Sequence, residues 1–122
     1  MPEALVTMDV RKPDDRMSIV DIRGELTGFA EEVLMNAYDE AAARGSRVII
    51  LNFEGLEYMN STGIGLLVTL LIRANRDGRT LMTCGLSQHY QTIFQITRLD
   101  DVIATFESED AAIHAATGSL AS

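Results

Sequence analysis

The fold of this chain is decided by one stretch, Glu57-Tyr58-Met59-Asn60-Ser61-Thr62-Gly63-Ile64-Gly65-Leu66-Leu67. The apolar run Val48-Ile49-Ile50-Leu51 precedes it and is typical of a strand that is buried on both faces. A second apolar segment, 64–72, is too long for one strand and predicts a helix packed against a sheet. The polar turn between these elements therefore places the hydroxyl of Ser61 at a helix N-terminus. We expect the function of the chain to be exerted at this turn.

Outward from this stretch, strand and helix patterns alternate. Upstream they predict two strands and a helix, at 5–10, 17–22 and 29–44. Gly24 is expected to end the second strand, and Phe29 is expected to open the buried stripe of the helix. Downstream of the strand at 48–52 they predict a loop at 53–59, a helix at 62–76 and a strand at 79–84. A helix opened by Ser87, a strand at 102–106 and a final helix capped by Ser108 follow.

The resulting order, β-β-α-β-α-β-α-β-α, predicts an α/β fold with a mixed, mostly parallel sheet of about five strands and about four helices. The first strand is joined to the second by a short turn and is expected to run antiparallel to it. Neither a repeat nor a linker divides the sequence. We therefore expect a single domain over 1–122, with its core at about 4–117.

The composition excludes several classes of function. The 122 residues carry a net charge of −8, and no run of Lys and Arg forms a basic stripe in the sequence, which argues against direct binding to nucleic acid. The longest apolar stretch is about half of the ~20 residues that a membrane span needs. With no signal peptide and a single cysteine, Cys84, we expect a cytoplasmic protein in which Cys84 is a buried strand residue.

Motifs of common enzymes are incomplete in this chain. Val68 stands where a dinucleotide-binding motif needs its third Gly, Met59 stands where a nucleophile elbow needs Gly, and the P-loop signature is absent. His89 has no acidic residue at helical spacing, and one Cys with two separated His, His89 and His114, makes no zinc set. We expect no enzyme, with neither a catalytic residue, a metal nor a cofactor.

Two interpretations of the central turn follow from the residues alone. Asn60 and Ser61 are both good helix N-caps, and simple capping is the favoured interpretation. Gly63 and Gly65 fit it less well, because each costs a helix ~1 kcal/mol relative to Ala. Such glycines are expected where another backbone approaches closely, either a neighbouring strand or a docked partner.

The stretch 58–67 closely resembles the signature of the STAS domain in the class of anti-sigma factor antagonists. The likeness extends to Gly24-Glu25-Leu26, to the strand 48–52 and to Thr97-Arg98-Leu99, and covers about 5–116. The resemblance implies a STAS-like fold and a regulatory role in transcription by partner switching. Members bind an anti-sigma factor that is also a serine kinase of the histidine-kinase-like ATPase fold, which frees the sigma factor. The kinase phosphorylates a Ser in the motif and ends the interaction, and a PP2C-type phosphatase restores it.

Carried over to this chain, the resemblance makes Ser61 the phosphorylated residue, with Thr62 as second choice. The best-known members have Asp immediately before the acceptor, whereas this chain has Asn60, which keeps the capping geometry but lacks the charge. We expect the partner to contact the motif and the neighbouring loops, at Gly24, Glu25, Met59, Asn60, Ser61, Thr62, Gly63, Gly65 and Ser87.

The contact surface is expected to combine 24–28, 85–89 and the exposed side of the helix 62–76, because ligands and partners gather beyond the C-termini of parallel strands. The alternative is a binding or scaffold module that senses a nucleotide, a lipid or another small ligand and is not phosphorylated.

Overall fold

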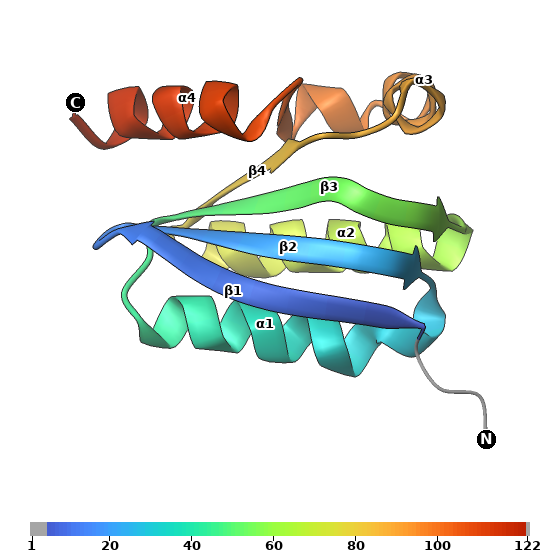
Figure 1. Ribbon diagram of the computed structural model, residues 1–122, viewed down its shortest axis with the longest axis horizontal. Helices are drawn as coiled ribbons and strands as arrows, with labels where there is room; N and C mark the ends of the chain where they lie inside the picture. Colours follow the sequence, from blue (N-terminus) through green and yellow to red (C-terminus); the bar gives the residue numbers. More distant parts are fainter. Residues whose placement is uncertain (1–4, 122) are drawn as a thin grey trace.

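The computed structural model describes residues 5–121, so that 1–4 and 122 of the expected domain lie outside it. Its five strands form one sheet in the order β1-β2-β3-β4-β5 (Figure 1). The strands are β1 (Val6–Asp14), β2 (Met17–Leu26), β3 (Val48–Met59), β4 (Thr80–Cys84) and β5 (Ala104–Phe106). The helices are α1 (Glu31–Ala43), α2 (Ser61–Arg76), α3 (Gln88–Ile96) and α4 (Glu109–Ala121), and short 3-10 turns occupy Gly28–Ala30 and Leu99–Asp101. β1 is antiparallel to β2 and the other pairs are parallel, which confirms the predicted fold class.

The apolar run at the start of β3 is buried on both faces, as its composition predicts. Ile49 and Leu51 belong to the core beneath α1 and α2, whereas Val48 and Ile50 belong to a second core with Ala112 of α4. Figure 1 shows α1 and α2 on one face of the sheet and α4 on the other. Because successive strand residues point to opposite faces, this single run supports both layers.

Two expectations about strand ends are wrong. β2 continues past Gly24 to Leu26, and the segment 53–59, expected to be a loop, is the second half of β3. β3 pairs with β4 only as far as Asn52 and Cys84, whereas its pairing with β2 runs on to Leu26 and Met59 through two register shifts. The second half of β3, at 53–59, is largely exposed, so polar residues and Gly55 are compatible with a strand there.

A buried carboxylate connects four elements on the α4 side of the sheet. Asp21 of β2 accepts hydrogen bonds from Arg11 of β1 at 2.6 and 2.8 Å and from the side-chain amide of Asn52 of β3 at 2.9 Å. Arg11 also pairs with Glu109 in the first turn of α4. The Arg11 guanidinium is the main reason why the pKa of Asp21 lies below its usual range, and the hydrogen bond from Asn52 lowers it further.

Stability is therefore expected to fall at acid pH through Asp21. Because its folded-state pKa is depressed, its contribution is complete well above pH 4 and is lost as the pH falls below the ordinary carboxylate pKa of about 3.9 toward the folded value. Asp21→Asn should lower the free energy of unfolding at pH 7 by about 1–3 kcal/mol, and the difference from wild type should shrink below about pH 4. Urea unfolding across pH measures both. The control Asp9→Asn removes an exposed carboxylate paired with Arg23 and should change stability by less than about 0.5 kcal/mol; equal effects of the two variants would contradict the assignment.

Candidate functional site

Asn60 caps helix α2. Its backbone is extended, and its side-chain oxygen Oδ1 accepts a hydrogen bond from the N–H of Gly63 at 2.9 Å. Its carbonyl oxygen accepts the first helical bond, from Ile64 at 3.0 Å. The capping expected of this turn is thus performed by Asn60, and the hydroxyl of Ser61 is not needed for it.

Ser61 is the first residue of α2 and its side chain is exposed. Within residues 5–121 its hydroxyl makes no hydrogen bond to another residue. Thr62 is exposed as well, but its methyl group faces the backbone of Gly28, where an added Cβ would lie 2.9 Å away. The two residues therefore differ in their surroundings, since Thr62 packs its methyl group toward Gly28 and no such neighbour is seen for Ser61 among the described residues.

The two glycines of the helix start differ in what surrounds them. A Cβ on Gly63 would lie 2.0 Å from the carbonyl oxygen of Leu26 at the end of β2, so a side chain is excluded there by a neighbouring strand. A Cβ on Gly65 would meet no atom within 4 Å, and Gly65 is exposed. The interior of the fold explains Gly63 but gives no reason for Gly65.

Segments far apart in the sequence meet at this end of the sheet. Glu25 and Leu26 are in register with Tyr58 and Met59, and the N–H of Asn60 reaches the Leu26 carbonyl at 3.4 Å. On the other side, the Tyr90 hydroxyl of α3 accepts a hydrogen bond from the N–H of Met59 at 2.8 Å. The structure thus brings the ends of β2 and β3, the start of α2 and the start of α3 to one edge.

Three of the expected contact residues are held by internal interactions. Met59 is only 4% exposed and packs in the core. Gly24 has a φ of +97°, and a Cβ there would lie 2.2 Å from the carbonyl oxygen of Leu5, so Gly24, like Gly63, is required by the fold itself. The exposed members of the expected set are Ser61, Thr62, Gly65 and Ser87, with Asn60 and Glu25 half-buried. Ser87 caps α3, as predicted, by accepting a hydrogen bond from the N–H of Tyr90.

Sequence reasoning did not predict the exposed apolar side chains in the turn before α1 and along α2. Phe29, expected to be buried, is 61% exposed because it lies in the 3-10 turn before α1, where the helical stripe has not yet begun. On α2, Val68 and Ile72 are exposed and continue the line of Ser61 and Gly65 at steps of three and four residues. Large apolar side chains grouped at the surface commonly mark a protein-binding face.

The groups considered for other chemistry lie elsewhere. Cys84 is fully buried in β4, as expected, and burial raises its pKa to about 11. His89 and His114 are exposed. Within residues 5–121, no three His, Cys, Asp or Glu side chains are grouped so that they could hold a metal ion. In the same part of the chain, no helix has the length and hydropathy needed to cross a membrane.

Comparison with known proteins agrees with the resemblance seen in the motif. The STAS domain family matches residues 7–112. The anti-sigma-B factor antagonist of Staphylococcus aureus is 31% identical over 96 residues, which are 79% of this chain and 89% of that protein.

Among solved structures, the anti-sigma factor antagonist SpoIIAA in its unphosphorylated form superposes with a TM-score of 0.71 at 22% identity, over 92% of this chain and 99% of SpoIIAA. The phosphorylated form of the Bacillus cell fate determinant SpoIIAA gives a TM-score of 0.69 at 22% identity, over 90% of this chain and 99% of SpoIIAA. At this identity the structural likeness concerns the fold, and the family follows from the sequence matches. The chain belongs to the STAS domain family, among the anti-sigma factor antagonists.

Proposed function

We propose that this chain binds an anti-sigma factor that is also a serine kinase of the histidine-kinase-like ATPase fold, and that phosphorylation of Ser61 releases it. Binding frees the sigma factor for transcription, and a PP2C-type phosphatase resets the switch. The protein then acts as a regulator and not as an enzyme. The observation that carries the proposal lies at the start of α2, where the Asn60 side chain caps the helix and the hydroxyl of Ser61 stays exposed.

The relatives support this proposal by what their names say of them. The Staphylococcus aureus relative is an anti-sigma-B factor antagonist, and SpoIIAA has been solved in both phosphorylated and unphosphorylated forms. The exposed residues around Ser61 fit a docking role. Gly65 leaves room for a partner backbone, and Val68 and Ile72 offer apolar surface further along the same helix.

The free protein should tolerate the phosphate. A phosphoserine carries about two negative charges at pH 7, and at position 61 these charges lie at the N-terminus of α2. The cap uses the N–H of Gly63, which leaves those of Ser61 and Thr62 as donors of the first turn. Helix N-termini stabilise anions, by up to ~2 kcal/mol in favourable sites.

The complex with the anti-sigma factor should not tolerate a phosphate on Ser61. In a closely packed interface the dianion loses its water, and an unpaired buried ion costs several kcal/mol. Since 1.4 kcal/mol corresponds to about a tenfold change in affinity, the cost at the interface exceeds the gain at the helix. Phosphorylation of Ser61 therefore acts as a release switch.

Mass spectrometry after incubation with ATP and the cognate kinase tests the proposal. The wild-type chain should gain one phosphate on Ser61 and Ser61→Ala none, because the Ser61 hydroxyl is exposed at the helix start and makes no hydrogen bond within residues 5–121. Thr62→Ala is the matched control and should be phosphorylated like wild type. Stable binding to the kinase without any phosphate transfer would instead support a module that binds its partner without being phosphorylated, and phosphate on Thr62 alone would move the switch.

A further inference from the structure

Three arginines form a row at the edge of the sheet opposite to Ser61. Arg16, Arg47 and Arg79 each stand immediately before a strand, namely β2, β3 and β4. These strands are neighbours and begin in register, with Met17 beside Val48 and Val48 beside Thr80. These arginines are therefore neighbours in the fold although about thirty residues separate each from the next in the sequence, so no basic run is seen there.

Two of the three guanidinium groups have internal partners. Arg79 donates hydrogen bonds to the carbonyl oxygens of Ser46 and Ala42, just after and within the last turn of α1. Arg16 donates to the carbonyl oxygen of Leu120 in the last turn of α4 at 3.3 Å. Cations at helix C-termini are stabilising, which accounts for both.

Arg47 has no such explanation. Its guanidinium makes no hydrogen bond or ion pair with any residue from 5 to 121, and its side chain is exposed. The backbone at this position is fixed, since the N–H of Arg47 donates to the Arg16 carbonyl at 2.8 Å and its own carbonyl accepts from Thr80 at 2.8 Å. The backbone of Arg47 is thus held in a defined place, and its guanidinium has no partner among residues 5–121.

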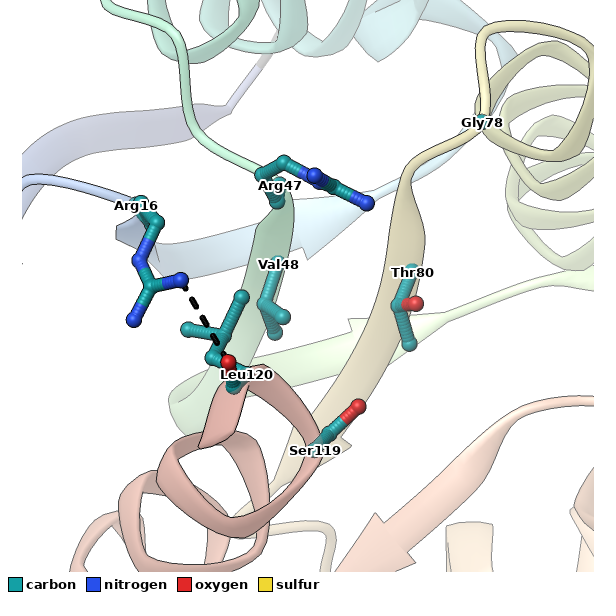
Figure 2. Close-up of a pocket in the computed structure, with 7 residues that line it drawn as sticks. All are labelled: Arg16, Arg47, Val48, Gly78, Thr80, Ser119 and Leu120. Atoms are coloured by element: carbon teal, nitrogen blue, oxygen red, sulfur yellow. Dashed lines mark hydrogen bonds between the residues drawn. The ribbon is translucent and has the colours of Figure 1, made fainter. Parts of the chain in front are cut away.

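Arg47 borders a pocket of about 180 Å³ that is also lined by Arg16, Thr80 and Ser119. Figure 2 shows Arg47 extended toward β4 above the pocket and Arg16 on its other side, near Leu120. None of the lining residues is acidic, although the chain as a whole carries a charge of −8. The pocket is thus lined by Arg47, whose guanidinium has no partner within residues 5–121, by Arg16, which also donates to Leu120, and by Thr80, residue types that suit an anion.

We propose that this pocket binds a phosphate group, held by Arg47 together with Arg16. The planar guanidinium fork matches the oxygens of a phosphate and can bind two of them at once. The pocket is smaller than the ~300 Å³ at which sites for complete small molecules begin, so it accommodates the phosphate group and not a whole nucleotide. The site lies at the opposite edge from Ser61 and is independent of the switch proposed there.

NMR titration of the ¹⁵N-labelled chain with inorganic phosphate, against sodium chloride at equal ionic strength, tests this site. Phosphate should produce saturable shifts at the amides around Arg16, Arg47 and Thr80 and at the side-chain N–H of Arg47. Arg47→Gln should weaken binding at least tenfold, because it removes a charge-assisted contact. A parallel titration with glycerol phosphate shows whether the site prefers a free or an esterified phosphate, and saturation by either supports the proposal.

Arg98→Gln is the matched control, because it removes the same single charge from an exposed arginine that belongs to another part of the surface. It should bind phosphate like wild type, and so should Ser61→Ala. Shifts that do not saturate or that chloride reproduces would overturn the proposal. Equal weakening by Arg47→Gln and Arg98→Gln would also overturn it, since the effect would then reflect overall charge.

Discussion

Replacing Ser61 with aspartate is expected to weaken binding of the anti-sigma kinase by about a hundredfold or more. The carboxylate supplies a charge where the proposed interface must exclude water, and it does so at an exposed position whose hydroxyl has no internal role. The free variant should unfold at the temperature of wild type or slightly above it, because acidic residues in a first helical turn are favourable. Isothermal titration calorimetry with the kinase measures the affinity, and circular dichroism follows the fold.

Two control variants show whether the effect comes from the added charge and from its position at residue 61. Ser61→Ala should keep the affinity of wild type within a fewfold, since it removes only a hydroxyl. Ser108→Asp makes the same change at the N-cap of α4, on the other face of the sheet, where Asp also caps well. It should bind like wild type. The switch is refuted if Ser61→Asp binds as tightly as Ser61→Ala.

The second large effect is expected at Gly63. Gly63→Ala should lower the free energy of unfolding by about 3 kcal/mol or more, because its Cβ would lie 2.0 Å from the carbonyl oxygen and 2.8 Å from the carbonyl carbon of Leu26. Relief would require the start of α2 to move away from β2 and thereby disturb the cap at Asn60. Urea unfolding measures the change.

Gly65 provides the matched comparison two residues along the same helix. Gly65→Ala meets open space and should raise the free energy of unfolding by up to ~1 kcal/mol through helix propensity. If a partner backbone docks over this position, the same variant should bind the kinase more weakly although it is more stable. A Gly63→Ala variant as stable as wild type would show that the approach of Leu26 is not a tight constraint.

The order of strands and helices could be predicted from the sequence because its strongest signals are local. The apolar run of β3 and the caps at Asn60, Ser87 and Ser108 each act within a few residues of the chain. The outer half of β3 could not be predicted, because its polar residues are in strand only through pairing with β2, a contact distant in sequence.

The sequence predicted the position of the candidate site and the segments around it, but not which residues of those segments are buried. The motif marked Ser61, whereas assigning the cap to Asn60 alone, and distinguishing Gly63 from Gly65, required the neighbouring strand. Phe29 was misplaced because its helical phase was extrapolated into a 3-10 turn. The arginine row depends on strand register, which the spacing of single residues in the sequence does not reveal.

The outer half of β3 has a consequence for self-association. Beyond Asn52 it pairs with β2 alone among the described strands, so that one margin of this part of β3 has no strand beside it. Two of its N–H groups are nevertheless occupied by side chains, that of Glu54 by Asn52 and that of Met59 by Tyr90. The charged Glu54 and Glu57 add repulsion between copies. These contacts and charges disfavour pairing of this margin with a strand of another copy.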